Sequence, residues 1–195
     1  KLSIDRLKNK TNKGINISKS EVVETIDTIN RQVDDIKSLV DEFSNFARMP
    51  APNMHEYNIK TIIENTISLF DVEKNKILID YNKKSLDCLV KCDESQINRV
   101  FNNLIINSIH AIEAKFKNKL GGKIFIDGNV EGKYIKIKIF DNGQGLVHKE
   151  ADLLKPYFST KDKNIGTGLG LSIVEKIISE HEGNFHIYNI DDESG

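Results

Sequence analysis

The chain has 195 residues, enough for one ordinary domain and a smaller appended element. Its 38% hydrophobic and 29% charged residues predict a globular protein with a substantial core. A net charge of −1 with scattered lysines does not fit a nucleic-acid-binding surface, which carries a basic excess. No apolar run reaches the roughly 18 residues of a membrane-spanning helix, and the first residues do not form a signal peptide, so we expect a cytosolic chain.

The two cysteines, Cys88 and Cys92, have no second pair that could complete a zinc site. We therefore expect both to be ordinary strand or core residues.

A heptad pattern runs from Ser20 to Arg48. Apolar residues recur there at steps of three and four, at Ile26, Ile29, Val33, Ile36, Val40 and Phe43. The pattern predicts a helix capped by Ser20 that ends before residues 49–52, because the prolines in Met-Pro-Ala-Pro cannot continue a helix. Upstream, the apolar residues among 1–7 predict the tail of another helix, and residues 11–18 a turn.

Two helices joined in this way form a hairpin whose apolar seam cannot be buried by the hairpin alone. A four-helix bundle built from two chains would bury it, so we expect a homodimer. The alternative is a hairpin that lies on the main domain of the same chain.

The remaining residues alternate between helical and strand patterns. Helices are expected over 56–69, 93–112 and 169–182, and strands over 77–81, 88–90, 123–127, 133–140 and 185–188. Residues 128–132 are expected to connect two strands as a hairpin. The order predicts an α+β fold, a two-layer α/β sandwich with helices on one face of a mixed sheet. We place the domain boundary between residues 50 and 51.

Three clusters in the second part each supply a group that a bound magnesium nucleotide needs. Asn107, on the predicted long helix, offers a neutral amide oxygen suited to magnesium. Asp141 offers a carboxylate to an adenine amino group, and Gly143 and Gly145 let a ligand approach closely. The run 166–170 opens a helix and offers backbone amides to phosphates. Alone, Asn107 could be a core amide and Asp141 a hairpin turn; together the clusters predict an ATP site.

The third cluster differs from two common phosphate loops. It lacks the lysine and hydroxyl residue of a Walker loop, and its glycine spacing is not that of a dinucleotide fingerprint. Residues 146–165 before it are expected to form a mobile lid. Within that lid Tyr157 and Phe158 form an apolar anchor, or ordinary core, and Lys161 could reach a phosphate.

The motif set resembles the ATP-binding catalytic domain of sensor histidine kinases, in the gyrase, Hsp90, histidine kinase and MutL superfamily, whose Bergerat-type fold is then expected. Residues 103–108 resemble its N-box, 141–145 its G1 box, 156–161 its F-box and 166–170 its G2 box. The resemblance extends from about residue 52 to near the end. The hairpin resembles the dimerisation and histidine phosphotransfer domain, and residues 43–50 resemble the linker of NtrY-type nitrogen-regulation kinases.

The resemblance implies roles for single residues. Asn107 is the expected metal ligand. His110 stands where a basic residue often meets phosphate, with an exposed helix residue as the alternative. Asn103 occupies the place of the glutamate base of the ATPase branches, which disfavours hydrolysis and favours phosphoryl transfer to a side chain. The candidate catalytic residues are Asn103, Asn107, His110 and Lys161. The candidate nucleotide-binding residues are Asn107, Asp141, Gly143, Gly145, Phe158, Thr160, Lys161, Gly166, Thr167, Gly168, Leu169 and Gly170.

The implied function is that of the cytoplasmic kinase core of a two-component sensor histidine kinase. It would use ATP and Mg²⁺, act as a homodimer, pass phosphate to the receiver domain of a response regulator and bind no nucleic acid. Its only link to the membrane would be through other regions of an inner-membrane-anchored protein. None of the five histidines has the sequence context of the family's acceptor. We therefore expect the acceptor upstream of Lys1, and one more strand after Gly195, so that the chain is a fragment.

Three other functions remain open from the sequence. A superfamily ATPase would need a base that the motifs do not supply. An anti-sigma-type serine kinase would share the motifs but would not need the heptad hairpin. A non-catalytic dimerisation module would bind no nucleotide.

Overall fold

The computed structural model describes residues 5, 8–10, 12–13, 18–70, 77–117, 119–155 and 168–190. The chain divides into two compact units, residues 1–49 and 50–195, and each is described by itself.

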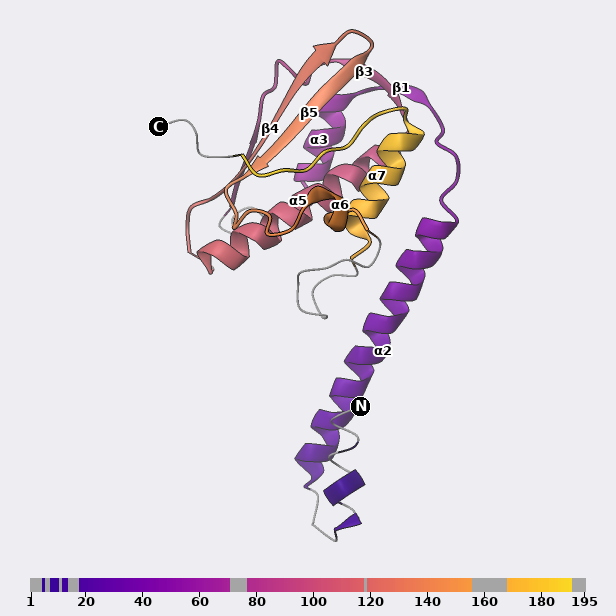
Figure 1. Ribbon diagram of the computed structural model, residues 1–195, viewed down its shortest axis with the longest axis vertical. Helices are drawn as coiled ribbons and strands as arrows, with labels where there is room; N and C mark the ends of the chain where they lie inside the picture. The colour runs from indigo at the N-terminus through magenta and orange to yellow at the C-terminus, as the bar shows by residue number, and fades with distance from the viewer. Residues whose placement is uncertain are drawn as a thin grey trace. The chain divides into compact units, whose positions relative to one another are not determined.

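The first unit consists mainly of helix α2, Lys19–Ala47 (Figure 1). Ser18, and not the predicted Ser20, is its cap. The amide of Glu21 donates to Ser18 Oγ at 3.2 Å, and the amide of Ser18 donates to Glu21 Oε2 at 3.3 Å. A glutamate three residues after a serine completes this reciprocal capping box, which fixes the helix start. The predicted end before Pro50 is confirmed.

Much of the apolar seam of α2 is exposed in the residues that the structure describes. Its exposed members are Val22, Ile26, Val33, Ile36, Val40 and Phe43, each 38–62% accessible. Upstream, residues 8–10 and 12 are helical, whereas Leu2, Ile4, Leu7 and most of the predicted turn at 11–18 lie outside the described residues.

The second unit contains the predicted mixed sheet. Its strands are β2 (Ile77–Tyr81), β4 (Gly122–Glu131) and β5 (Tyr134–Asp141), in the order β2-β4-β5. Strand β2 runs parallel to β4, and β4 runs antiparallel to β5. The predicted hairpin is confirmed, but its turn is shorter than the predicted connection at 128–132: Gly128 belongs to β4 and pairs with Ile137, and the turn is at residues 132–133. Gly132 has a φ of +64°, the left-handed conformation that a tight hairpin turn uses.

A separate two-stranded antiparallel sheet joins β1 (His55–Asn58) to β3 (Leu89–Cys92). Residues 56–58 were expected to begin a helix, so this strand corrects the prediction. Asn58 caps helix α3 (Ile59–Ile67) by accepting a hydrogen bond from the Lys60 amide, which forces the helix to start later. Cys92 is 1% exposed, as expected of a core residue, and burial raises the pKa of its thiol to about 11.

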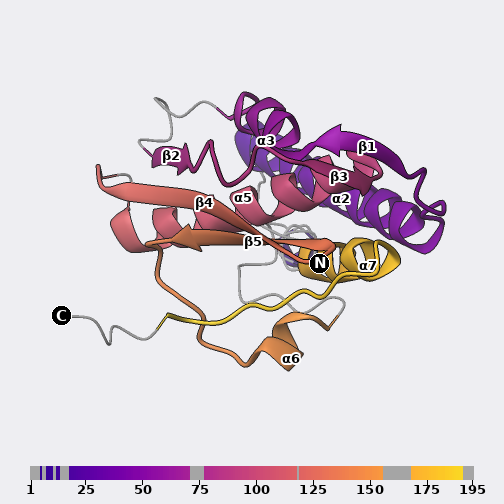
Figure 2. The ribbon, with the colours of Figure 1, turned by 90° about the horizontal axis from the view of Figure 1, so that it is seen from above.

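The remaining helices are α5 (Glu94–Phe116), α6 (Glu150–Leu153) and α7 (Gly170–Glu180). Helix α5 packs on β4 and β5 and is flanked by α3 and α7, so the helices cover one face of the sheet (Figures 1 and 2). The side chains that close this interface are at most 1% exposed: Ile62, Ile63, Ile105, Ile124, Ile126, Ile173 and Ile177. The predicted two-layer sandwich is confirmed.

Residues 183–190 do not form the strand expected near 185–188. Exposure alternates along residues 183–188 as in a strand, but the segment forms no ladder in the described structure. Instead, Glu150 and Asn189 provide side-chain hydrogen bonds that hold it: the Ile187 amide donates to Glu150 Oε1 at 2.9 Å, and Asn189 bonds to Leu146.

Asp93 fixes the start of α5, as predicted. Its Oδ1 accepts from the Gln96 amide at 3.0 Å, and its Oδ2 accepts from the Asn53 amide at 2.9 Å. Burial raises the pKa of this carboxyl, but the hydrogen bonds from Asn53 and Gln96 outweigh burial, so the pKa lies below its ordinary value.

Asp93→Ala should lower the free energy of unfolding by about 1–2 kcal/mol at pH 7, because α5 loses its cap. A lowered pKa gives stability that is full above about pH 4, the pKa of an unfolded aspartate, and that is lost as the pH falls through the folded value. Urea unfolding at pH 7 and pH 3 measures both effects. Asp93→Asn keeps an acceptor for the Gln96 amide but loses the charge and the second oxygen that the Asn53 amide uses, so its loss at pH 7 should be smaller than that of alanine. A loss as large as that of alanine would contradict the capping role.

Candidate nucleotide site

Helix α5 and the start of α7 bring the first and third sequence clusters together. A Cβ built on Gly170 would lie 3.2 Å from Asn103 Oδ1 and 4.0 Å from Asn107 Nδ2. Asn103 also donates from Nδ2 to the carbonyl of Arg99 at 2.9 Å, which directs its oxygen away from its own helix backbone. The two asparagines are half-buried. Gly170, the first residue of α7, therefore lies against the side-chain amides of Asn103 and Asn107.

The second cluster joins the same helix through Asp141, the last residue of β5. Ser108 Oγ donates to Asp141 Oδ2 at 3.0 Å, and the Gly143 amide donates to Asp141 Oδ1 at 2.9 Å. Asp141 remains exposed, whereas Ser108 is buried. The carboxylate is thus held in one orientation against Ser108, the residue after Asn107 on α5, with part of its surface exposed. Sequence reasoning missed Ser108, because a serine in a helix carries no signal for a carboxylate far along the chain.

The loop after Asp141 lies directly on α5. The Gln144 amide donates to the carbonyl of Ala111 at 3.1 Å. A Cβ on Gly143 would lie 2.7 Å from the carbonyl carbon of Ala111, closer than two such atoms can approach. Only glycine fits at this position.

Gly143→Ala should therefore displace the loop, lower the free energy of unfolding by about 1–3 kcal/mol as overpacking does, and weaken ATP binding. Thermal unfolding and calorimetric titration with ATP measure the two effects. Gly132→Asn is the matched control, because nothing lies within 4 Å of its Cβ and asparagine tolerates positive φ. Wild-type stability and affinity in Gly143→Ala would show that the loop does not rest on Ala111.

Two further side chains fix the loop, and the sequence did not identify either. Asn142 donates from Nδ2 to the Gly121 carbonyl at 2.8 Å and accepts from the Lys123 amide at 2.8 Å. Lys115 Nζ donates to the carbonyl of Asn142 at 2.8 Å. The loop is therefore bonded to β4 and to the last turn of α5.

Part of the third cluster is described. Gly168 has a φ of +72°, and Leu169 is fully buried directly before α7. The helix start presents its amides and positive dipole end at Gly170, beside the asparagines. Gly166 and Thr167 lie outside the described residues.

The predicted lid is described only at its beginning. It includes α6, which ends at Leu153, and the carbonyl of the next residue, Leu154, accepts a hydrogen bond from Ser172 Oγ of α7 at 3.0 Å. The residues 156–161, with Phe158, Thr160 and Lys161, lie outside the described residues. His110 is half-buried on α5. Its phosphate-binding role stays a prediction.

The donor set fits a magnesium nucleotide better than a metal ion bound by the protein alone. In the described ranges no group of three histidine, cysteine or carboxylate side chains could hold a metal ion. One amide oxygen at Asn107, beside a helix start that can receive phosphates, suits Mg²⁺, which keeps waters and phosphate oxygens as its other ligands.

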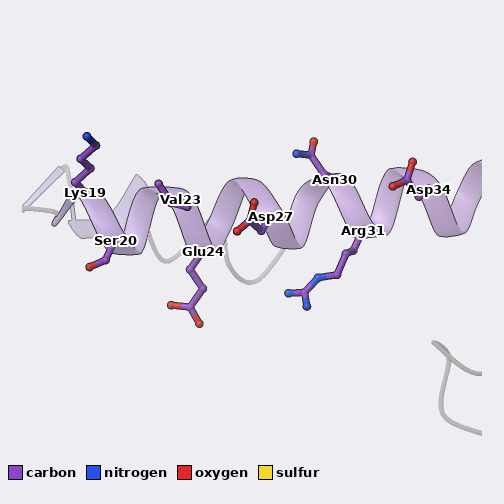
Figure 3. A pocket seen from close by; sticks show the side chains of 8 residues that line it. All are labelled: Lys19, Ser20, Val23, Glu24, Asp27, Asn30, Arg31 and Asp34. Carbon is purple, nitrogen blue, oxygen red and sulfur yellow. The ribbon is translucent and has the colours of Figure 1, made fainter.

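A hollow on α2 is separate from these clusters. It is lined by Lys19, Ser20, Val23, Glu24, Asp27, Asn30, Arg31 and Asp34, all on one helix (Figure 3). It belongs to the first unit and contains none of the candidate nucleotide residues.

Comparison with known proteins identifies the family. Residues 92–195 match the model of the histidine kinase-, DNA gyrase B- and HSP90-like ATPases. The chain belongs to this family, so its second unit is an ATP-binding fold.

Individual proteins that resemble the chain include one nitrogen-regulation protein and several histidine kinases of known structure. The nitrogen regulation protein NtrY of Azorhizobium caulinodans is 37% identical over 188 residues, which is 95% of this chain and 24% of that protein. The chain thus spans about a quarter of that relative's length. The nucleotide-free catalytic domain of histidine kinase ThkA is 30% identical, with a TM-score of 0.55 over 66% of this chain and 81% of that one. ThkA in complex with the response regulator TrrA has a TM-score of 0.64 at 22% identity over 92% of this chain and 50% of that one, a likeness of fold.

None of the helices in the ranges that the structure describes is both long and apolar enough to cross a membrane.

Proposed function

We propose that this chain is the kinase core of a two-component sensor histidine kinase, which binds Mg-ATP and transfers the γ-phosphoryl group to a histidine. The observation that carries the proposal is the convergence of Asn107, Asp141 and Gly170 on helix α5. Asn107 would hold the magnesium ion, which neutralises phosphate charge. Asp141 would accept the hydrogen bond of the adenine amino group, and the start of α7 would receive phosphates.

Transfer to a side chain is favoured over hydrolysis by Asn103. An amide cannot take a proton from water as a carboxylate base does, and Asn103 already donates to Arg99. His110 and Lys161 would contribute positive charge or hydrogen bonds to the phosphates, and Phe158, Thr160, Gly166 and Thr167 would complete the nucleotide pocket. These roles follow the family motifs.

Each of the two units would have its own role. Residues 1–50 would form part of a dimerisation and phosphotransfer hairpin, and residues 51–195 the catalytic domain. The exposed seam of α2 supports this, because six large apolar side chains on one helix face would be buried in a bundle of two chains.

The partner would be the receiver domain of a response regulator, as ThkA was solved with TrrA. The likeness to NtrY points to a kinase of nitrogen regulation, cytoplasmic in this part and anchored in the inner membrane by other regions.

Incubation with γ-labelled ATP and magnesium tests the proposal. The chain is mixed with an upstream-extended form that carries the acceptor helix and Asn107→Ala, so that label on the extended form must come from this chain. Acid-labile, alkali-stable label on the extended form is expected. Free phosphate without labelled protein would indicate an ATPase, and label stable to acid a serine kinase.

A further inference from the structure

The base loop, residues 141–146, is held at its far end by a side chain from the end of the described chain. The Leu146 amide donates to Asn189 Oδ1 at 2.7 Å, and Asn189 Nδ2 donates to the Leu146 carbonyl at 2.8 Å. A side-chain amide carries one acceptor and a donor in the arrangement of a peptide group, so Asn189 pairs with Leu146 as one residue of a neighbouring strand would.

The neighbouring glycine lies against the same side chain. Gly145 has a φ of +76°, and a Cβ there would lie 3.0 Å from Asn189 Oδ1. The left-handed conformation of Gly145 turns the chain so that both backbone groups of Leu146 face Asn189. The turn and the amide therefore form one unit.

The segment that carries Asn189 is itself anchored. Glu150 Oε1 accepts from the Ile187 amide at 2.9 Å and lies 3.2 Å from His186 Nδ1. These bonds join α6 to residues 186–187, which Figure 2 shows running back from the end of α7 past α6. Asn189 is thus held in place independently of the loop that it contacts.

The base loop is bonded to its surroundings at both ends: residues 141–144 are bonded to α5 and β4, and Leu146 is bonded to Asn189. At Gln144 it is bonded to α5, which also carries Asn107, so this attachment ties the loop to the metal side of the site. At Leu146 it is bonded only to Asn189 among the hydrogen bonds described above. Loss of the bonds at Leu146 would loosen the end of the loop at residues 145–146, and it would leave the bonds of residues 141–144 and the residues that would meet phosphate unchanged.

We propose that Asn189 is a positioning residue for adenine binding, which acts through Leu146 and does not itself touch the nucleotide. The proposal rests on the proposed function, because it assumes that the loop 141–146 receives the base. It assigns a role in nucleotide affinity to a residue outside every motif of the family.

Asn189→Ala removes both bonds and should raise the dissociation constant of Mg-ATP about fivefold, as expected for two exposed hydrogen bonds. Binding of inorganic tripolyphosphate with magnesium, which lacks a base, should not change. The KM for ATP should rise with the rate at saturating ATP unchanged. Asn189→Asp keeps the acceptor for the Leu146 amide but places an oxygen against the Leu146 carbonyl, so it should weaken ATP at least as much. Tyr188→Ala, an exposed neighbour, is the matched control and should leave both affinities unchanged.

Amide hydrogen exchange of Leu146 without nucleotide provides a readout independent of catalysis, and it should accelerate in Asn189→Ala. Unchanged ATP affinity in Asn189→Ala, in a chain whose wild type binds ATP, would overturn the inference and leave the proposed function standing. Equal losses for ATP and tripolyphosphate, with a lower melting temperature, would show a general structural role and would also overturn it. A wild-type chain that binds no ATP would overturn the proposed function and, with it, this inference.

Discussion

Asn107→Ala is expected to weaken binding of ATP in the presence of magnesium by about a hundredfold or more, on the order of 2.7 kcal/mol. In the proposed site the amide oxygen of Asn107, on α5 close to the start of α7, would be the metal ligand, and alanine has no oxygen to replace it. Isothermal titration with ATP, in magnesium and in EDTA, measures the effect. The loss should be confined to the magnesium titration.

The variant Asn107→Asp distinguishes the effect of an oxygen ligand for the metal from the effect of added negative charge. It keeps an oxygen but adds a negative charge that faces the phosphates, so an affinity between those of wild type and alanine is expected. Asn129→Ala, on the exposed part of β4, serves as the control for substitution of an asparagine. If Asn107→Ala binds Mg-ATP as wild type does, while it melts at the same temperature, Asn107 is not the metal ligand.

Asp141→Ala is expected to weaken ATP between about tenfold and a hundredfold, the range for a hydrogen bond to a charged group. Ser108 and Gly143 orient this carboxylate, so its remaining surface is available to the adenine amino group. Competition titrations with ATP, GTP and magnesium tripolyphosphate measure the effect. The preference for ATP over the other two should disappear.

Tripolyphosphate provides the internal control for Asp141→Ala, because it occupies the phosphate side without a base. An equal loss of ATP and tripolyphosphate would mean that Asp141 supports the loop as a whole. The adenine contact would then have to be assigned to another group.

The sequence predicted the layers of the fold because they follow from local patterns. Apolar steps of three and four place α5 correctly, and the alternating run 134–140 becomes β5. Asn107, Asp141 and Gly170 were predicted as one site because each carries a chemical requirement of the same ligand. Their proximity is now described by the contacts of Gly170 and Ser108.

The errors in the prediction concern partners distant in the sequence. The alternating pattern over 185–188 predicts a strand. A strand also needs a neighbouring strand to form backbone hydrogen bonds with, and the pattern of one segment does not show whether such a neighbour exists. The four-residue strand β1 was missed because its residues continue into a helical pattern and its partner strand, β3, lies far along the chain. Ser108, Asn142 and Asn189 were missed for the same reason: their hydrogen bonds span 33, 21 and 43 positions.

Helix α5 has a consequence for the size of ligand that the chain can accept. Asn107 and Ala111 stand on the same rigid helix, about 6 Å apart along its axis. If Asn107 binds the metal and the loop on Ala111 binds the base, the helix fixes the distance between the metal-binding and base-binding positions. A ligand that occupies both positions must therefore span a fixed distance along the helix.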